Sequence, residues 1–284
     1  MIIGLLHPGA MGSAVGAQLV AAGHQCGWVP EGRGSATRRR AAEAGLTALT
    51  KLDELASCDV VVSVCPPAAA LDVARQVARI GFTGCYVDAN AISPRHSEGI
   101  AAVLDGATVV DGGIVGPPPR KPDTTRLYLS GPGDAVTRVH DLFRHTTLTP
   151  VVLPGPVGAA SALKLAYATY NKVSIVLAAQ AHALARQHGV DAQLRELAAA
   201  TLPGTPFADP ERLVSAGQRA WRWAPEMREI AETCRDAGLP ADLLDAAEAF
   251  LTHWRQHKDD PDLTLDQLLG ALTGVRGQAA QPDT

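Results

Sequence analysis

The stretch IIGLLHPGAMGSAVG, residues 2–16, comes almost at the start of the chain and determines how its first half is interpreted. It combines a short apolar run, a turn with spaced glycines and the first residues of a helical pattern. This order of strand, glycine-rich turn and helix is typical of a loop that binds the pyrophosphate of a dinucleotide. In the usual spacing G-x-G-x-x-G, however, His7 stands at the first glycine position.

The other two glycine positions are kept, as Gly9 and Gly12. The second glycine lets backbone N–H groups at the helix N-terminus approach a phosphate, and the third lets the helix pack close to the strand. Gly16 extends that close-packed face by one turn. Histidine tolerates a left-handed backbone better than most residues, so we expect the turn to form and to bind a nucleotide. The alternative is an ordinary strand–turn–helix in which His7 only fills the turn. The predicted loop contacts are His7, Pro8, Gly9, Ala10, Met11 and Gly12.

The segment after the second predicted strand bears on which dinucleotide binds. NAD sites place an acidic residue on the ribose hydroxyls there, whereas NADP sites place arginine nearby. Glu31 is available, but Arg33, Ser35 and Arg38 follow it closely. We therefore favour NADP as the cofactor, with NAD as the alternative, and assign these last three residues to it. If Arg33 is only a solvated loop residue, this preference has no basis.

Composition excludes several classes of protein. The chain has 284 residues, 46% of them hydrophobic, and a formal net charge of −4. This is a globular composition without the basic surface of a nucleic-acid or anionic-membrane partner. The five cysteines are scattered and form no C-x-x-C pair, and we find neither a signal segment nor a run long enough to span a bilayer. We expect a cytoplasmic protein with reduced thiols and no nucleic-acid or membrane partner.

Strand and helix patterns alternate through the first half and give way to helices alone. Runs rich in Val and Ile, separated by helical stretches, predict a parallel sheet buried on both faces. The fold class is thus α/β: a Rossmann-type, doubly wound, mostly parallel sheet in residues 1–154, then an all-helical substrate and dimerisation domain in residues 155–284. The strand-like runs are residues 2–6, 25–29, 59–67, 84–90, 107–113, 126–131 and 149–154. The later helices are expected near residues 192–202, 210–220, 225–237, 241–257 and 265–272.

A helix of about 30 residues is expected at the domain junction, near residues 157–188. It is apolar nearly all round, which a helix on the surface of a small domain cannot be. We therefore expect it to be enclosed by other helices and by a second subunit in a homodimer.

Four motifs resemble those of the β-hydroxyacid dehydrogenases, the group that includes 3-hydroxyisobutyrate and 6-phosphogluconate dehydrogenases. GLLHPGAMG, residues 4–12, matches the family's GFIGLGxMG, and YVDANAISP, residues 86–94, matches its segment DxST or DxGN. VVDGGIVGP, residues 109–117, stands where the family has DAPVSGG. GPVGAASALK, residues 155–164, keeps the glycine-to-lysine spacing of GxxGxGxxxK and is the most specific match. The second half looks most like a subgroup whose helical domain has no assigned function.

The resemblance implies hydride transfer between NAD(P) and a small hydroxy acid or its carbonyl form, with Lys164 as the general acid/base. The position of this lysine supports that role independently, because it follows the expected domain junction in an apolar helix. Burial would disfavour its charged form. Tyr167 and Asn171 fall near it on the same helix face, and Lys172 about 80° round the helix. The alternatives are that Lys164 only extends to solvent at the helix start and that Lys172 forms a salt bridge at the rim.

The sequence departs from the family at three places. Ala168 stands where the family has asparagine four residues after the lysine, and 115–117 reads Val-Gly-Pro where the family has Ser-Gly-Gly. The family's later Lys-Asp pair is also absent, since residues 225–229 read PEMRE. The substrate, expected to be small and anionic, is therefore not identified. Further cofactor contacts are assigned to Cys65, Pro66 and Asn90, and substrate contacts to Asn90, Val115, Gly116, Arg120, Tyr167, Asn171 and Lys172.

Three other functions share features with this sequence. An imine reductase would have the same fold with an altered lysine site, and a sensor or scaffold would bind NADP without turnover. A metalloenzyme is disfavoured, because His253 and His257 have helical i, i+4 spacing but no evident third ligand. We therefore predict no metal site.

Overall fold

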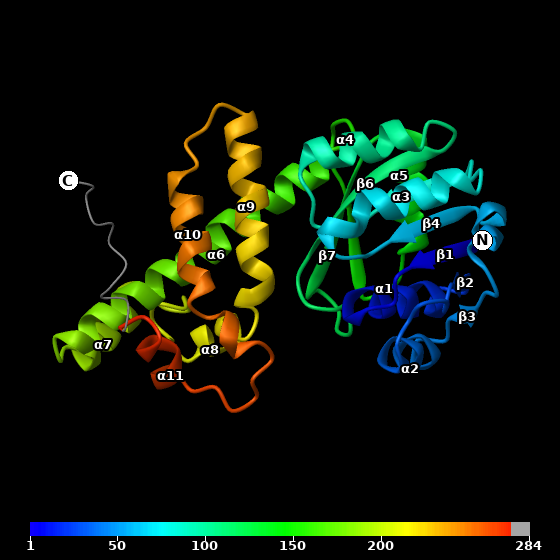
Figure 1. Ribbon diagram of the computed structural model, residues 1–284. Helices are drawn as coiled ribbons and strands as arrows, with labels where there is room; N and C mark the ends of the chain where they lie inside the picture. Colours follow the sequence, from blue (N-terminus) through cyan, green and yellow to red (C-terminus); the bar gives the residue numbers. More distant parts are fainter. Residues whose placement is uncertain (274–284) are drawn as a thin grey trace, which may run out of the picture. The chain divides into compact units, whose positions relative to one another are not determined.

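The computed structural model describes residues 1–273 of the chain. It divides into two compact units, Met1–Ala166 and Tyr167–Thr284, of which the first is α/β and the second helical (Figure 1). The division falls inside the long helix α6. The boundary expected between residues 154 and 155 lies in the loop before that helix and stays a prediction.

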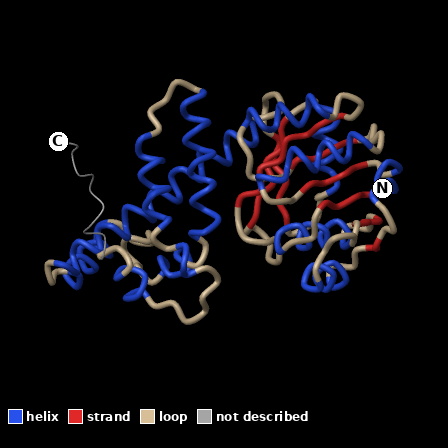
Figure 2. The backbone as a smooth tube through the Cα atoms, in the orientation of Figure 1, coloured by secondary structure: helices blue, strands red, loops and turns tan. Residues whose placement is uncertain are grey.

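The first unit is built on one eight-stranded sheet with the order β3-β2-β1-β4-β5-β6-β7-β8 (Figure 2). All neighbouring strands are parallel except β6 and β7. The residues between these two strands form no crossover helix, and antiparallel neighbours need none. The strands are β1 Ile2–Leu6, β2 Gln25–Trp28, β3 Thr47–Ala48, β4 Val60–Ser63, β5 Cys85–Asp88, β6 Thr108–Val115, β7 Thr125–Ser130 and β8 Leu148–Val152.

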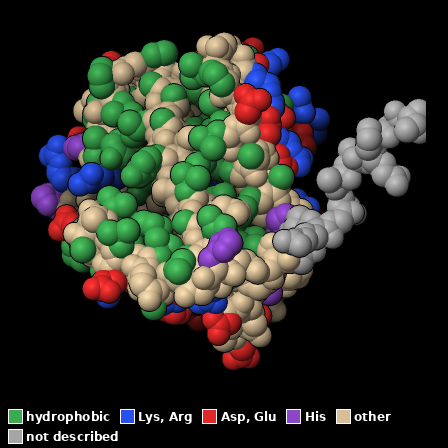
Figure 3. All heavy atoms as spheres, turned by 90° about the vertical axis from the view of Figure 1, so that its left-hand side faces the viewer, with side chains coloured by type: hydrophobic (Ala, Val, Ile, Leu, Met, Phe, Trp, Pro, Cys, Tyr) green, Lys and Arg blue, Asp and Glu red, His purple; other side chains and the backbone are tan. Residues whose placement is uncertain are grey.

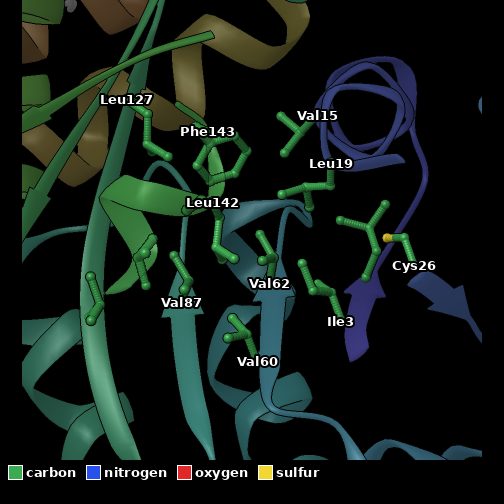
Figure 4. Close-up of a cluster of buried hydrophobic side chains, with 14 of the residues drawn as sticks. Ile3, Val15, Leu19, Cys26, Val60, Val62, Val87, Leu127, Leu142 and Phe143 are labelled. Atoms are coloured by element: carbon green, nitrogen blue, oxygen red, sulfur yellow. The ribbon is translucent and has the colours of Figure 1, made fainter. Parts of the chain in front are cut away.

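Helices cover both faces of this sheet, so the predicted fold class is confirmed. They are α1 Ala10–Ala21, α2 Ser35–Glu43, α3 Ala70–Arg79, α4 Pro94–Val103 and α5 Gly133–Leu142, with 3-10 turns η1 Leu52–Ser57 and η2 Pro67–Ala69. Alternate residues of one strand pack into different clusters. Val60 and Val62 join the cluster that holds Phe143 (Figure 4). Val61 joins the other cluster, with Val77 of α3.

The long helix α6, Ala159–Gln187, has 29 residues and begins in the first unit and continues into the second. It agrees with the helix of about 30 residues expected from the sequence. The second unit adds α7 Asp191–Thr201, α8 Arg212–Gly217, α9 Ala220–Asp236, α10 Asp242–Thr252, η3 Arg255–His257 and α11 Leu265–Gly270. Each helix described in residues 1–273 is either too short or too polar to cross a bilayer.

Helix α9 differs from the sequence prediction, because it starts at Ala220 and includes Pro225. Proline was expected to begin a new helix, since it cannot donate to the preceding turn. Trp223, Ala224 and Met227 are buried on either side of it. Their packing keeps the chain helical through the proline, and ion pairs such as Arg228–Glu248 tie α9 to α10.

Candidate active site

The glycine loop between β1 and α1 has the geometry of a phosphate cradle. Helix α1 begins after Gly9, which is its N-cap. A Cβ on Gly9 would meet no atom within 4 Å, whereas a Cβ on Gly12 would overlap the backbone carbonyl oxygen of His7. A Cβ on Gly16 would lie 2.8 Å from Leu5. Open space thus lies beside the helix N-terminus, while the later glycines bring helix and strand together as expected.

The turn forms without the left-handed residue that we expected at its first position. The non-glycine residues with positive φ among those described are Asp123, His145 and Asp259, so His7 is not one of them. The expectation of a left-handed backbone at His7 is therefore wrong. A histidine is accommodated because the backbone there needs no glycine conformation.

A cavity of about 230 Å³ lies beside this loop. Its lining includes His7 and Pro8 from the loop and Glu31 and Arg33 from the segment after β2. The Nδ1 atom of His7 is buried without a hydrogen-bond partner in the structure. Burial, with the nearby Arg33 charge adding to it, lowers the pKa of His7 to about 4. The ring is therefore neutral at physiological pH and offers an unused polar atom, which suits a bound cofactor.

The other residues assigned to cofactor specificity lie elsewhere. Arg38 donates to the carbonyl oxygens of Pro30, at 2.7 Å, and of Arg33, at 3.1 Å. It therefore holds the loop after β2. Ser35 is the first residue of α2 and is exposed. The structure thus places Arg33 against the cavity, next to Glu31.

Asn90 joins the ends of β4 and β5. Its Oδ1 accepts a hydrogen bond from the backbone N–H of Cys65 at 2.6 Å, and its Nδ2 donates to Ser63 Oγ at 3.2 Å. Burial raises the pKa of the Cys65 thiol to about 11, so this cysteine stays protonated. Pro66 follows directly and caps η2. Two of the predicted cofactor residues, Asn90 and Cys65, are thus brought into contact.

Lys164 lies close to Asn90. Its Nζ donates to the backbone carbonyl oxygen of Asn90 at 3.3 Å. The first turn of α6 can approach strand β6 because Gly113 has no side chain: a Cβ there would be 2.7 Å from the carbonyl oxygen of Ala160 and 3.3 Å from Lys164 Cβ. The predicted acid/base residue is therefore positioned at the carboxyl end of the sheet.

Asp111, which the sequence analysis did not single out, anchors the start of α6. Its Oδ2 accepts from the backbone N–H groups of Gly158 and Ser161, at 3.0 and 2.9 Å. The hydroxyls of Ser97, Ser130 and Ser161 also donate to this carboxylate. Carboxylates stabilise helix N-termini in this way. The motif VVDGG carried the signal, since an acidic residue inside a buried strand needs such partners.

The loop after β6 holds the remaining candidates of the first unit. Val115 ends β6 and is half-buried, while Gly116 and Arg120 are exposed. The loop is fixed at Pro119, whose carbonyl oxygen accepts from Gln18 of α1 at 3.1 Å and from Thr147 at 2.9 Å.

The second unit contains the other predicted substrate residues. Tyr167 and Asn171 are exposed. Lys172 is buried and forms an ion pair with Glu226 of α9, with its Nζ 5.6 Å from the centre of the Trp223 ring. Burial lowers the pKa of Lys172, although Glu226 opposes that effect.

His253 and His257 do not share a helix. His253 is the C-cap of α10, and His257 ends the 3-10 turn η3. Within residues 1–273, no three side chains of His, Cys, Asp or Glu gather as metal ligands would.

Known proteins resemble this chain along most of its length. A sequence profile described as a domain of unknown function (DUF1932) matches residues 185–254. An uncharacterized 28.5 kDa protein in the 7S RNA 5′ region of Methanothermus fervidus is 26% identical over 227 residues, 78% of this chain and 87% of that protein. The solved structure of a conserved protein of unknown function, described as similar to 3-hydroxyacid dehydrogenases, matches with a TM-score of 0.72 and 26% identity over 90% of this chain and 98% of its own. The 3-hydroxyisobutyrate dehydrogenase of Mycobacterium tuberculosis matches with a TM-score of 0.76 and 19% identity over 95% and 98%.

The chain has the β-hydroxyacid dehydrogenase fold. The resemblance inferred from the four motifs is thereby confirmed. The profile match places a domain of unknown function in the helical half, as expected for the subgroup. In this β-hydroxyacid dehydrogenase fold, the glycine cradle and Lys164 belong to the same unit, Met1–Ala166.

Proposed function

We propose that the protein is an oxidoreductase that transfers a hydride between NADP(H) and a small hydroxy acid or its carbonyl form, with Lys164 as the general acid/base. The observation that carries this proposal is Lys164 at the carboxyl end of the sheet, with its Nζ 3.3 Å from Asn90 O. Relatives of the same fold include the Mycobacterium tuberculosis 3-hydroxyisobutyrate dehydrogenase described with L-serine and a protein described with NADP+. Ligands of open parallel sheets bind at the carboxyl ends of the strands.

The cofactor supplies or accepts the hydride when it is bound. The backbone of Gly9–Gly12 at the N-terminus of α1 would hold its pyrophosphate, because N–H groups and the helix dipole favour negative charge there. The cavity beside His7 would hold the adenosine end. Arg33 favours a cofactor that carries an additional phosphate, and Glu31 favours one with a free ribose hydroxyl. Both residues line the cavity, and we assign NADP(H) because the positive charge of Arg33 would attract the additional phosphate.

Lys164 handles the proton that accompanies the hydride. In oxidation, the hydroxyl oxygen of the substrate loses its proton as the carbon loses hydride, and the neutral Lys164 Nζ accepts that proton. In reduction, the ammonium form returns a proton to the carbonyl oxygen. The Asn90 carbonyl orients the amine by accepting one of its hydrogens. The exposed Arg120 and Asn171 remain our candidates for the anionic part of the substrate. Lys172 is buried and already paired with Glu226, and we assign Tyr167 to the dimer stripe described below.

An imine reductase is the second candidate. Val115 stands where a hydroxyl would bind a carboxylate, so a substrate without a carboxylate is consistent with this loop. An imine reductase from Pseudomonas sp. has a similar fold, with a TM-score of 0.58 and 17% identity. Reduction of cyclic imines but not of keto acids would establish this function instead.

We further propose a homodimer formed through α6. Its apolar residues Tyr167, Tyr170, Leu177 and Leu184 are between 54% and 78% exposed. With Ser174 and Ala181 between them, they repeat at intervals of three and four residues, the spacing of a coiled-coil seam. Figure 3 shows hydrophobic side chains spread over the face of the molecule that it presents. A second copy of the chain would cover this stripe.

All five cysteines are free thiols. A reducing compartment such as the cytoplasm, which we propose as the location, keeps thiols in that state.

Titration with NADPH and NADH, followed by a screen of hydroxy acids, keto acids and imines, tests the enzymatic function. Lys164→Met should then lower turnover by about 10²–10⁴-fold while NADPH affinity stays within a few-fold. Lys172→Met should have a smaller effect on turnover, and the exposed Lys51→Met should have none. Near-normal turnover of Lys164→Met on any substrate found would overturn the assignment of the acid/base residue.

A further inference from the structure

Four neighbouring strands place polar side chains at the same level of the sheet. Ser63 pairs with Asp88, Asp88 with Asp111, and Asp111 with Ser130 in the strand register. All four residues are buried, with exposures of 0 or 1%. A row of this kind inside a sheet is costly unless every polar atom has a partner.

The two carboxylates of this row, Asp88 and Asp111, differ in the number of hydrogen bonds that they accept. Both oxygens of Asp111 accept hydrogen bonds from the start of α6 and from serine hydroxyls. Asp88 accepts one, at Oδ1, from the backbone N–H of Asn90 at 2.9 Å. Its Oδ2 is buried and has no hydrogen-bond partner among the described residues. The charge of Asp88 therefore needs compensation from another source.

Lys164 is a positive charge that acts on Asp88. Its Nζ contacts the carbonyl oxygen of Asn90, two residues beyond the aspartate. The neighbouring groups in the described part of the chain include neutral and negative ones: Ser63 and Cys65 from β4 and the loop after it, Tyr86 on its own strand, and Asp111 on β6. Burial raises the pKa of Asp88 to about 6, with hydrogen bonding from Asn90 and the charge of Lys164 opposing the rise.

We propose that Asp88 is the buried counter-ion of Lys164 and controls how strongly Lys164 holds its proton. This inference rests on the proposed function of Lys164. Asp88 is a positioning residue: it touches neither substrate nor cofactor, and no proton moves to it. When Lys164 accepts the substrate proton, an ammonium forms, and the ionised Asp88 stabilises that ammonium through space. Asp111 is less able to adjust to this change because its oxygens are already committed to the N-terminus of α6.

Two conservative variants separate charge from structure. Asp88→Asn keeps the size of the side chain and an oxygen that can accept from Asn90 N, but it removes the negative charge. Tyr86→Phe removes a neighbouring buried hydroxyl without changing any charge. If Asp88→Asn does not fold, Asp88→Ser provides a second neutral side chain that can accept the same hydrogen bond.

The direct measurement is the titration of the lysine Cε carbons by NMR in protein labelled with ¹³C-lysine. The chain has five lysines, and Lys164→Arg identifies the signal of Lys164. Asp88→Asn should move the titration midpoint of Lys164 downward by about one pH unit or more, because a neighbouring opposite charge favours the ammonium. Tyr86→Phe should leave it within about 0.3 of the wild-type midpoint, a shift too small for the loss of a full charge. An unchanged midpoint in Asp88→Asn overturns the proposal.

Kinetics distinguish a failure of this inference from a failure of the proposed function. In the oxidative direction, the limb of the kcat/KM profile that reports deprotonation of Lys164 should move to lower pH in Asp88→Asn. If Lys164→Met abolishes turnover but neither the NMR midpoint nor this limb moves in Asp88→Asn, the counter-ion role alone is refuted. If Lys164→Met retains turnover, the proposed function fails, and the counter-ion role of Asp88 in catalysis fails with it.

Discussion

Ser161 and Asp111 are joined by two hydrogen bonds, from the serine backbone N–H at 2.9 Å and from its hydroxyl at 2.7 Å. The two residues are 50 positions apart, one on strand β6 and the other in the first turn of α6. A side chain of the sheet thus caps the helix that carries Lys164. The position of the proposed acid/base residue therefore depends on a contact made one turn earlier.

Ser161→Ala should destabilise the protein and disturb the site. It removes a buried hydroxyl donor to a carboxylate, a bond of about 1–3 kcal/mol. Thermal unfolding should show a lowered Tm, and kcat should fall while NADPH affinity is kept. The exposed Ser57→Ala, which loses a bond to the Glu54 carbonyl, serves as the matched control with little change. Wild-type Tm and kcat in Ser161→Ala would contradict the anchoring role.

Asp88→Asn should stabilise the protein at neutral pH. The folded-state pKa of Asp88 is raised from 3.8 to about 6 by burial. A raised pKa means that ionised Asp88 opposes folding, and this cost grows as pH rises from about 4 to about 6. Two pH units correspond to about 2–3 kcal/mol. Denaturant unfolding should show a gain for Asp88→Asn at pH 8 that shrinks towards pH 4, and a gain independent of pH would exclude this cause.

Arg33→Ala should weaken NADPH binding much more than NADH binding, since the guanidinium is expected to contact the additional phosphate. Isothermal titration of both cofactors measures the difference. Arg39→Ala is the control, because Arg39 lies on exposed α2 and pairs with Glu43. Equal losses for both cofactors, or a preference of the wild-type protein for NADH, would show that the cofactor is not NADP.

Leu177→Glu and Leu184→Glu should dissociate the proposed dimer. Both side chains are 58% exposed on α6, and a buried carboxylate in an apolar seam has no partner. Light scattering at micromolar concentration should show monomers for these variants and dimers for the wild type. Gln180→Glu adds the same charge outside the stripe and should stay dimeric. A monomeric wild-type protein would refute the proposal.

Asp191→Asn should destabilise the helical unit at neutral pH. The fully buried His182 contacts Asp191 Oδ1 through Nδ1 at 2.9 Å and the Phe207 carbonyl through Nε2 at 2.8 Å. Partial burial disfavours ionised Asp191, but hydrogen bonds from His182 and Arg195 outweigh it and lower its pKa. A lowered carboxyl pKa stabilises the fold above the unfolded value of about 4, and this contribution is lost as pH falls further.

The difference in Tm between wild type and Asp191→Asn should therefore be largest near pH 7 and shrink as pH falls below about 4. Asp266→Asn is the comparison, since its side chain is 86% exposed and pairs only at the surface with Arg186. A deficit of equal size at pH 3 and pH 7 would mean that the charge of Asp191 is not responsible.

Local pattern missed the two-residue strand β3, Thr47–Ala48. It was sufficient to predict the other seven strands, the cradle glycines and the long helix. Each of these features depends on residues close together in the chain, such as Gly9 and Gly12. The helix predicted to begin at Pro225 in fact begins at Ala220, because packing of buried residues outweighs the local preference of proline for a helix start. The partners of Lys164 were not predictable either: its contact with Asn90 joins residues 74 positions apart, and strand order brings them together. The row of buried polar residues requires the strand register, which a single sequence does not specify.

Because Gly113 has no side chain, strand β6 and the first turn of helix α6 lie close together. The carbonyl oxygen of Ala160 would lie 2.7 Å from any Cβ placed there, so an alanine would push the first turn of α6 away from the sheet. Lys164 would then move with the helix. A side chain at this position would require a compensating change elsewhere, such as a displaced helix or a base of different length. Position 113 is therefore a natural point at which to adjust the depth of the site by design without changing any residue that performs chemistry.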